Sequence, residues 1–547
     1  MPEPIDLLLL ADTVLTPEVL AGAEPEPGYV AVSGNRIVSV GPAADSASWR
    51  ERAARVIDLG PSVISSGFID AHIHPILGLE FSRGIELTEF RDRESVSSAV
   101  AAYCRDTSSE WVLGWGLDPS ALDNRLDNSF LDDAAQARKV CLTLSDDHAV
   151  IVSDAALEAA GITGHETFPD ASVVGTDSAG VPNGALIENS AADLVRALVP
   201  PLTFDQRVDA LEDLLTGMAA SGLVAGQMLD LAVADSFDLL DALEARTELP
   251  IRLRVSPWLD AGSDDRRMEE LAEMQGRHGR RWKVRGIKMM IDGTIDNGTA
   301  WLQEPDTRGE STSSLWLDPD RYRRAVEYYD FKGIPTTTHA IGDRAVDFVA
   351  GVISGLPEGG PQHRIEHLET LPDDILQRVV DSGAAVSMQP THCTLYTYAD
   401  HHDNWSQRLG AERADHAWRT ADLRGRGVIV TLGSDWNVAP YDPRAILASA
   451  VLRRPAGHPE IAPIHPEQGL SRRESVEGYT SQYWASVGET GGEIVAGGRA
   501  DLSVFGANPL TCHPDEFAEA AVILTVVDGV ISTDNLAALP DRASSTR

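Results

Sequence analysis

Short apolar stretches alternate with longer amphipathic stretches through the middle of this 547-residue chain. The stretches expected to form strands include residues 251–255, 284–291 and 334–338. The stretches expected to form helices include residues 264–276, 318–332 and 342–353. Because strands and helices alternate at this spacing, the pattern predicts an α/β fold built on parallel strands. An open doubly wound sheet and a closed barrel both agree with it.

The two ends of the chain have a different texture, with short apolar stretches separated by turn residues. These stretches are residues 5–10, 29–32, 37–40, 56–59, 502–505 and 522–527. The texture is typical of a small β-sandwich, and chain termini often lie close together, so both ends are expected to build one domain. We therefore divide the chain into a first sandwich part (1–65), a central domain (66–485), and a second sandwich part with a tail (486–547). Residues 78–205 fit the alternation poorly and are expected to be an insertion over one face of the central domain.

The balance of charged residues excludes one large class of partner. Lys and Arg total 45 and Asp and Glu total 84, which leaves a formal charge of −39. Nucleic acids and anionic membrane surfaces require a basic surface on the protein, so neither is expected as a partner. No stretch approaches the roughly 18 apolar residues of a membrane-spanning helix. Residues 7–11 are apolar, but no basic residue precedes them as in a signal peptide.

The four cysteines are widely spaced and form no Cys-x-x-Cys pair; they are Cys104, Cys141, Cys393 and Cys512. A disulfide framework or a thiolate zinc site is therefore not expected. This usage fits a reducing compartment, so the sequence predicts a cytoplasmic location.

The most specific motif is GFIDAHIHP, residues 67–75, which follows an apolar stretch. Alternate residues of a strand point to the same face, so His72 and His74 project together. Two imidazoles side by side suit a divalent metal such as zinc. For this motif alone, the simpler alternative is that one histidine caps a turn and the other packs in the core.

Other expected strands also end in metal-ligand residue types: His339 after residues 334–338, His367 after residues 364–366, and Asp435 after residues 428–434. Each one alone agrees equally with a helix cap or a packed side chain. Together with the first motif they place four histidines and one aspartate at the carboxyl ends of separate strands, where parallel barrels build their active sites. Neutral imidazoles with one carboxylate suit zinc better than magnesium or calcium.

Lys288 lies within the apolar stretch 286–291 of a chain that has only four lysines. A buried lysine is costly unless it is neutralised or paired. Its presence where arginine is otherwise the usual basic residue suggests amine chemistry. A lysine whose head reaches solvent, or one that forms an ion pair with Asp292, is the alternative.

Residues 401–403, His-His-Asp, also contain ligand residue types. They follow no apolar strand and are expected in a loop, so they are not taken as a metal site.

At these motifs the sequence resembles the amidohydrolase superfamily, and more narrowly the branch that includes the N-substituted formamide deformylases. The resemblance covers nearly the whole chain. It is carried by residues 67–74, by Lys288 before Asp292-Gly293-Thr294, and by the segments 339–345, 364–367, 433–435 and 498–502. Asp147-His148 and residues 155–162 resemble the insertion of this branch.

The resemblance implies a (β/α)8 TIM barrel, with a small β-sandwich domain from both termini and an insertion after the first barrel strand. It implies that one zinc ion is held by His72, His74 and Asp435, and a second by His339 and His367. A carboxyl group derived from CO2 on Lys288 would bridge the two ions.

The implied reaction is hydrolysis of a C–N bond in a small-molecule amide by metal-activated hydroxide, with N-substituted formamides as the leading substrate class. Asp435 would act as general base and then general acid. His148 and His392 are candidate donors to the oxyanion, and Trp115 and Trp436 are further candidate substrate-binding residues.

Three alternatives stay open at this point. The same site suits a deaminase or a cyclic-amide hydrolase, because fold does not determine function. A non-catalytic binding protein on a decayed scaffold is less favoured, because every candidate ligand is present.

A homodimer is expected, since this is the commonest oligomer.

Overall fold

The computed structural model describes residues 5–88, 90, 92–123, 125–135, 137–230 and 235–539. Residues 540–547, the end of the expected tail, lie outside this range. Among the described residues, no helix combines the length and the apolar character needed to cross a membrane.

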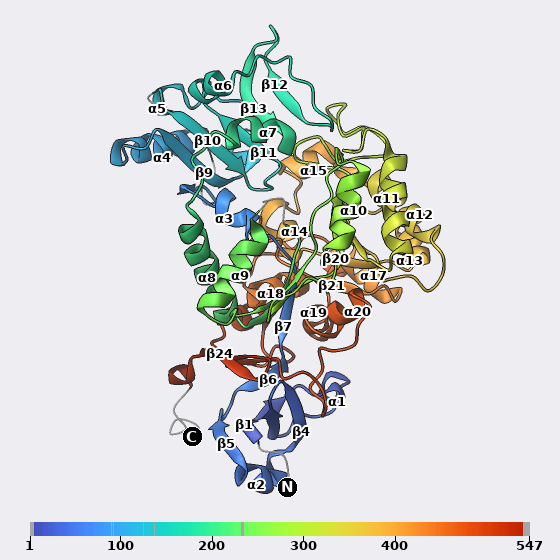
Figure 1. Ribbon diagram of the computed structural model, residues 1–547. Coiled ribbons are helices and arrows are strands. Elements are labelled where there is room, and N and C mark those ends of the chain that lie inside the picture. Colours follow the sequence, from blue (N-terminus) through green and yellow to red (C-terminus); the bar gives the residue numbers. More distant parts are fainter. Residues whose placement is uncertain are drawn as a thin grey trace.

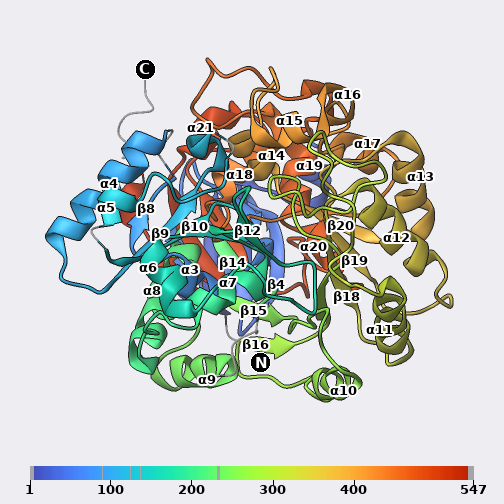
Figure 2. The ribbon, with the colours of Figure 1, turned by 90° about the horizontal axis from the view of Figure 1, so that it is seen from above.

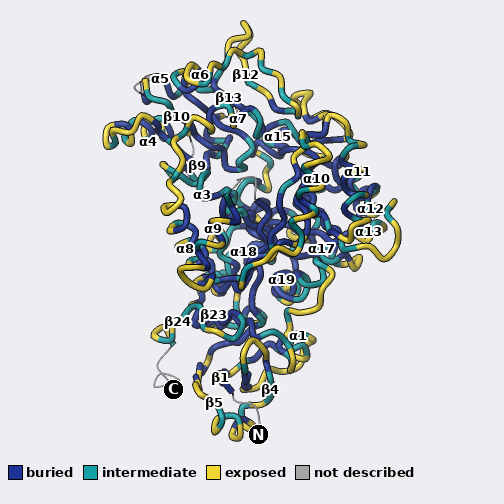
Figure 3. The backbone as a smooth tube through the Cα atoms, in the orientation of Figure 1, coloured by how far each residue is buried: buried dark blue, intermediate teal, exposed yellow. Residues whose placement is uncertain are grey.

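Two parallel sheets form the centre of the molecule. The first has the strand order β16 (Trp282–Val284), β15 (Arg252–Val255), β14 (Leu223–Met228) and β7 (Phe68–Ile73). The second has the order β17 (Ile287–Met290), β18 (Thr336–Ala340), β19 (Arg364–His367), β20 (Ala385–Met388) and β21 (Val430–Leu432). Seven of these strands are buried at every residue, whereas β15 and β16 alternate between buried and more exposed positions (Figure 3). Burial on both faces is typical of parallel strands that are covered by helices.

The two parallel sheets contact each other through two backbone bridges, one beside the edge strands β7 and β21 and one between the segment that follows β15 and the edge strand β17. Ile73 pairs with Trp436 beyond the end of β21, and Trp258 pairs with Lys288 in β17, both in the parallel sense. Backbone hydrogen bonds strengthen each junction: the amide of Asp435 donates to the carbonyl of His72 at 2.8 Å, and that of Leu259 to Lys288 at 2.9 Å.

Helices surround the parallel strands on the outside (Figure 2). They are α8 (Phe204–Ala220), α9 (Ser236–Arg246), α10 (Asp265–Glu273), α11 (Pro319–Phe331), α12 (Asp343–Ser354), α13 (Asp373–Ser382), α17 (Thr420–Gly425), α18 (Pro443–Leu452), α19 (Arg472–Gly478) and α20 (Ser481–Ser486). Each of the three helices expected from the sequence is present, with ends that differ by a few residues. In α12, Val346, Val349 and Ala350 are buried on one face, so the apolar period of the sequence matches the face that packs inward.

The segment expected to be an insertion forms a sheet of its own. Its six strands have the order β12 (Val173–Thr176), β13 (Pro182–Ile187), β11 (Ala149–Val152), β10 (Lys139–Leu144), β9 (Trp111–Leu117) and β8 (Ile85–Glu86). Its helices are α3 (Leu77–Phe81), α4 (Arg93–Asp106), α5 (Asp132–Ala135), α6 (Asp154–Ala160) and α7 (Asn189–Arg196). The sheet lies above the parallel strands in Figure 1 and has separate hydrophobic cores.

Strands from the two ends of the chain form two further sheets at the opposite end of the molecule (Figure 1). One has the order β4 (Arg36–Pro42), β3 (Gly28–Ser33), β1 (Ile5–Ala11) and β5 (Ala53–Asp58). The other has the order β2 (Thr13–Val14), β6 (Val63–Ser66), β22 (Leu502–Phe505), β23 (Val522–Val527) and β24 (Val530–Asp534). Leu9 and Val30 share one core with Val504 and Leu524, so residues separated by almost the whole chain are packed together.

The remaining elements are short. They are α1 (Pro17–Leu20), α2 (Ala47–Arg50), α14 (Pro390–Tyr396), α15 (Asn404–Leu409), α16 (Ala411–Ala414) and α21 (Pro514–Ala518), with 3-10 turns at 43–45, 119–122, 466–468 and 536–538.

Candidate metal centre

The carboxyl ends of the parallel strands bring the candidate ligands to one edge. His72 lies near the end of β7, His367 is the last residue of β19, and Asp435 follows β21. Neighbouring strands are in register there, with Met290 of β17 opposite His339 and Ala340 opposite His367. Parallel strands end at the same edge of a sheet, which is why residues so distant in sequence meet here.

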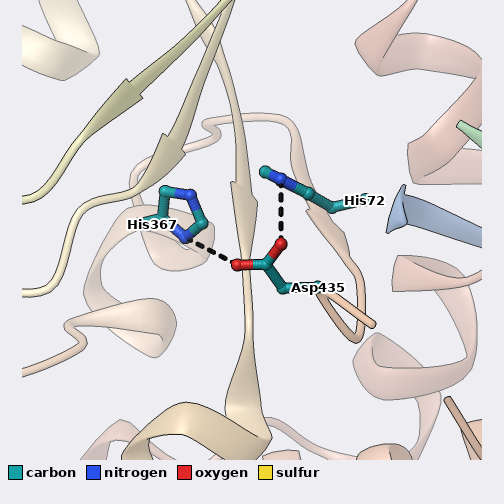
Figure 4. A group of neighbouring side chains, drawn as sticks. All are labelled: His72, His367 and Asp435. Atoms are coloured by element: carbon teal, nitrogen blue, oxygen red, sulfur yellow. Dashed lines mark ion pairs between the residues drawn. The ribbon is translucent and has the colours of Figure 1, made fainter. Parts of the chain in front are cut away.

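Three side chains converge at the centre of this edge: His72, His367 and Asp435 (Figure 4). One potential ligand atom of each lies within 4.8 Å of the others, and all three residues are buried. Oδ1 of Asp435 lies 3.2 Å from Nε2 of His72, and Oδ2 lies 3.9 Å from Nδ1 of His367. His74 adds a further nitrogen, because its Nε2 lies 3.1 Å from the same Oδ1.

These separations fit a tetrahedral metal ion. Nε2 of His72 and Nε2 of His74 lie 3.2 Å apart, so with Oδ1 of Asp435 they form a nearly equilateral triangle. Zinc–nitrogen bonds of about 2.0–2.1 Å place two tetrahedral ligand atoms about 3.3 Å apart. Oδ1 of Asp435 is buried and has no hydrogen-bond partner among the described residues. A carboxylate oxygen in that position is costly unless a cation lies beside it.

A carboxylate and an amide group each contact one ring nitrogen of two of these histidines. Nδ1 of His72 donates to Oε2 of Glu366 at 2.7 Å, which leaves Nε2 with its lone pair facing the centre. Glu366 is held in turn by Nε of Arg364 at 2.5 Å, and both residues are fully buried. Nδ1 of His367 contacts Oε1 of Gln389 at 2.9 Å. The supporting roles of Glu366, Arg364 and Gln389 were not predicted from the sequence.

Asp70 holds the ends of β7 and β21 together. Its Oδ1 accepts from the backbone amides of His72 and Ser434, both at 3.0 Å. Gly433 permits this close approach, because a Cβ there would lie 2.8 Å from the His72 nitrogen and 2.9 Å from Oδ1 of Asp70. Burial raises the pKa of Asp70 to about 7.

The protonation states suit metal binding. Burial holds the pKa of His72, of His339 and of His367 well below its usual range, so these rings are neutral at neutral pH. Burial alone would raise the pKa of Asp435, but contacts with His72 and His74 outweigh it and keep that pKa well below the usual range. Neutral imidazoles and an ionised carboxylate are the forms that bind zinc.

Lys288 is fully buried beside this group. Its Nζ lies 3.3 Å from Nε2 of His72, and burial lowers its pKa to about 8. Only 1% of its surface is exposed, so its head does not reach solvent. An ion pair with Asp292 is not formed either: among the described residues no carboxylate oxygen lies within 4.0 Å of Nζ, and Asp292 accepts from the backbone amides of Trp301 and Gly342. Both simpler explanations of this lysine are therefore wrong.

His339 lies at the side of the cluster. Its ring is 4.5 Å from that of His367, measured between centroids. Its Nε2 lies 3.2 Å from the carbonyl oxygen of Gly293, and since a carbonyl only accepts, that contact places a proton on Nε2. The two halves of the expected two-metal site thus differ: the ligand atoms of His72, His74 and Asp435 lie 3.1–3.2 Å apart, whereas Nε2 of His339 contacts a backbone carbonyl.

A cavity opens above the cluster, between the strand ends and the insertion sheet. Its lining includes the six candidate ligands and insertion residues at 118–120, 145–148 and 189. His148 and His392, both predicted to bind substrate, line this cavity. Nε2 of His392 is buried without a hydrogen-bond partner among the described residues and lies 3.8 Å from Oδ2 of Asp435. Burial lowers the pKa of His148, but Glu188, 2.9 Å from its Nδ1, together with Asp146 and Asp147 raises it to about 9.

The two tryptophans predicted to bind substrate, Trp115 and Trp436, are not among the residues that line the cavity. Trp115 lies in β9 and Trp436 packs against the main core, with its ring over Gly78. The backbone carbonyl of Trp436 accepts from the amide of His74 at 2.8 Å, so this residue supports a candidate ligand through its main chain. The cavity instead presents Trp258, Trp405 and Trp418, which the sequence analysis did not single out.

A second group of ligand residue types lies in loops at the surface. His401 forms it with Asp415 and His465. Asp415 is exposed, and the side chain of His401 is partly exposed. The sequence prediction that His401 lies in a loop is confirmed.

The parallel strands and the buried His/His/Asp group at their carboxyl edge place this protein in a class: α/β proteins with a candidate metal-dependent active site. Residues 55–533 match the sequence model of a protein family, Amidohydro_3, which is described as the amidohydrolase family. The chain therefore belongs to the amidohydrolase family, which confirms the resemblance seen in the sequence.

Similar proteins span nearly the same length. The chain is 27% identical over 496 residues to a protein named putative amidohydrolase YtcJ of Bacillus subtilis, covering 87% of this chain and 90% of that one. It is 24% identical over 524 residues to the N-substituted formamide deformylase of Arthrobacter pascens, covering 92% and 94%. Its fold is similar to that of an uncharacterised metal-dependent hydrolase from Pyrococcus horikoshii, with a TM-score of 0.68, 20% identity and coverage of 93% and 99%.

Proposed function

We propose that this protein is a zinc-dependent hydrolase that cleaves the C–N bond of a small-molecule amide. The observation that carries the proposal is the triangle formed by Nε2 of His72, Nε2 of His74 and the unpartnered Oδ1 of Asp435. Membership of the amidohydrolase family supports the reaction class. The name of one relative, N-substituted formamide deformylase, makes N-substituted formamides the first substrate class to test.

The architecture that goes with this function is a (β/α)8 barrel. We infer that the two parallel sheets form one barrel, in which β16 and β17 count as a single bent strand. The two backbone bridges between the sheets support this. Residues 78–205 would then be an insertion after the first barrel strand. Residues 1–65 would be the first part of a β-sandwich domain, and residues 486–547 its second part and a tail.

In the proposed reaction, Asp435 transfers protons, and His392 and His148 stabilise the oxyanion. When bound, zinc would lower the pKa of a water molecule to about 7 and polarise the substrate carbonyl. Asp435 accepts a proton from the attacking water and passes it to the leaving nitrogen, as general base and then general acid. His392 donates from its unpartnered Nε2 to the oxyanion that develops on the carbonyl, and His148 is a second donor.

Lys288 would hold a carboxyl group derived from CO2 and, with His339 and His367, complete a site for a second ion. Its position supports this role, since Nζ faces Nε2 of His72 from a fully buried strand.

We further propose a cytoplasmic location and a homodimer. The four cysteines, all free in the structure, agree with a reducing compartment.

The test combines metal content with product analysis. Protein purified without chelator should contain one or two zinc ions per chain by mass spectrometry, and His72→Ala should lower that number. The protein should release formate and an amine from N-alkyl or N-aryl formamides. A matched surface variant, His458→Ala, should keep both properties, because the side chain of His458 is 58% exposed.

Other outcomes would replace the proposal. Release of ammonia from a heterocycle that stays intact would indicate a deaminase, and opening of a cyclic amide would indicate a cyclic-amide hydrolase. Failure to bind metal, even after zinc and bicarbonate are added, would contradict the proposal and favour a binding protein on a decayed scaffold.

A further inference from the structure

The surface group formed by His401, Asp415 and His465 has the composition of a metal site, and we call it the loop cluster. One potential ligand atom of each residue lies within 4.8 Å of the others. The three residues lie in separate loops: between α14 and α15, directly after α16, and directly before the 3-10 turn at 466–468. The fold therefore brings together two imidazoles and one carboxylate that are distant in the sequence.

The sequence motif at 401–403 divides between this cluster and other contacts. His402 stacks on Tyr398, with ring centroids 4.2 Å apart. Asp403 is buried and caps α15, where its Oδ1 accepts a backbone amide of that helix at 2.7 Å. Its Oδ2 accepts from the backbone amide of Tyr398 at 2.9 Å. Asp403 therefore closes the loop from which His401 projects.

The other two residues of the loop cluster project from backbone that is held by buried neighbours. Asp415 directly follows Ala414, which is buried. His465 directly follows Ile464, which is also buried. The amide of Ile464 donates to the carbonyl of Arg453 at 2.7 Å, and Nε of Arg453 donates to the carbonyl of Ile464 at 3.0 Å. The backbone positions are therefore fixed, while the side chains can adjust.

Two of the three residues have an uncommon backbone conformation. The φ angles of His401 and His465 are 59° and 44°, in the left-handed region. Histidine adopts this region more readily than most residues with a Cβ, but it remains unfavourable. Such conformations persist where the surrounding structure enforces them, and they are frequent at ligand sites.

The side chains of the loop cluster face one another without bonding directly. Nε2 of His401 lies 3.9 Å from Oδ1 of Asp415, which is beyond hydrogen-bond distance. Among the described residues, no hydrogen bond joins any two of the three side chains. Tetrahedral zinc ligands lie about 3.3 Å apart, so the ligand atoms must move closer together around an ion. The side chain of Asp415 is 65% exposed and is free to make this movement.

The surroundings favour a cation of a particular kind. Oε1 of Glu467 lies 3.5 Å from Nδ1 of His465, so a further carboxylate is available to orient this ring or to share the ion. The formal charge of −39 on the whole chain also attracts cations. Two imidazoles suit a transition-metal ion such as zinc, whereas magnesium and calcium prefer a full set of oxygen ligands.

We propose that the loop cluster binds a divalent transition-metal ion, with water completing the tetrahedron around its three protein ligands. This site uses none of the candidate ligands of the metal centre, and it does not rest on the proposed function. Its loops reach the cavity, because Tyr398 and Trp418 line it. A bound ion therefore ties two loops that line the cavity to the segment that ends at His465.

The first experiment counts zinc ions. Full-length protein is loaded with zinc, dialysed until only tightly bound zinc remains, and then titrated with further zinc by equilibrium dialysis in excess magnesium. Magnesium occupies exposed carboxylates that would otherwise bind zinc unspecifically. The wild type should bind one further zinc ion per chain. His401→Ala and His465→Ala should each weaken this binding by at least about tenfold, since even loss of a ligand's partner costs about 10- to 100-fold.

The matched control is His458→Ala. His458 lies in the same loop as His465, and its side chain is 58% exposed and contacts Glu460. This variant should bind the further ion as the wild type does. A melt without added zinc shows whether each variant is folded, and failure of one ligand variant to fold leaves the other as the test.

The second experiment measures the same binding through stability. A ligand that binds only the folded protein raises its melting temperature. Zinc added to the loaded protein should raise the Tm of the wild type and of His458→Ala, and leave that of His401→Ala and His465→Ala unchanged.

Three results would overturn the proposal: no further zinc ion in the wild type, equal binding in all variants, or displacement of that ion by magnesium. His72→Ala should keep the further ion and lose tightly bound zinc. If His72→Ala instead retains all the tightly bound zinc while His465→Ala still loses the further ion, the proposed function fails and this inference stands.

Discussion

At the scale of single residues, Arg364 and Glu366 form the support on which the geometry of His72 depends. Both point to the same face of β19 because they alternate along the strand, and both are fully buried as an ion pair. Glu366 orients the ring of His72 at 2.7 Å, and Nη2 of Arg364 donates to the backbone carbonyl of Ala71 at 2.8 Å. The pair therefore connects β19 to β7 beside the candidate ligand His72. Loss of the pair should lower the affinity for the metal ion.

We predict that Glu366→Gln lowers the affinity for zinc by about tenfold or more, because partners of a ligating histidine typically contribute factors of about 10 to 100. Competition with a chelating dye measures this without reference to activity. Glu158→Gln, at an exposed position of α6, is the matched control. An affinity equal to that of the wild type would show that Glu366 does not position His72.

The ligand residue types could be predicted from the sequence because each follows an apolar stretch in linear order. His72, His367 and Asp435 need only the rule that parallel strands end at one edge. Gln389 and Trp418 could not be found in this way. Their roles depend on which loops meet across the cavity, and nothing in the local sequence of a loop specifies its neighbour.

At the scale of elements, the strands and helices of the central domain were predictable because their apolar period is local. The sheet of the insertion was not, since β9 pairs with β10 in the parallel sense across a long connection and β11 pairs with β13. Trp115 illustrates the consequence. Trp115 was predicted to bind substrate. It lies in β9, but the cavity is lined by residues 118–120, which follow this strand.

The loops after the parallel strands also place acidic groups where they reduce stability. The pKa of Asp296 is raised to about 7, while in the unfolded chain it is about 3.9. Between these values the folded protein keeps a proton that the unfolded chain has released, so the free energy of unfolding falls as the pH rises. Asp296→Asn lacks this titration. We predict that its stability relative to the wild type increases from about pH 4 to about pH 7 and is constant above that range.

Denaturant unfolding of both proteins across this pH range measures the difference. Asp238→Asn, which removes the same charge from an exposed position of α9, is the matched control. A difference for Asp296→Asn that does not change with pH would show that Asp296 is not perturbed in the folded protein.

At the scale of the whole molecule, the seam between the parallel sheets and the sheets built from both chain ends is polar and specific. Arg252 of β15 contacts Asp501, with Nη1 2.6 Å from Oδ1 and Nη2 2.5 Å from Oδ2. Nη2 of Arg281 donates to the carbonyl of Val527 at 3.0 Å, and the hydroxyl of Ser532 donates to the carbonyl of Pro250. These contacts join segments that are hundreds of residues apart, so no local pattern in the sequence predicts them.

The bidentate pair of Arg252 and Asp501 should couple the two parts energetically. Their side chains are 14% and 8% exposed, and removing Arg252 leaves the nearly buried carboxylate of Asp501 with only the more distant Arg499, at 3.7 Å, as a basic partner among the described residues. We predict that Arg252→Ala lowers the free energy of unfolding by about 3 kcal/mol. The matched control is Arg55→Ala, whose pair with Asp534 is about half exposed and should contribute less than about 1 kcal/mol. Denaturant unfolding followed by tryptophan fluorescence and by circular dichroism measures both variants. Equal losses for the two variants would contradict coupling through this seam, because Arg252 is more buried than Arg55 and also contacts Asp528 at 3.5 Å.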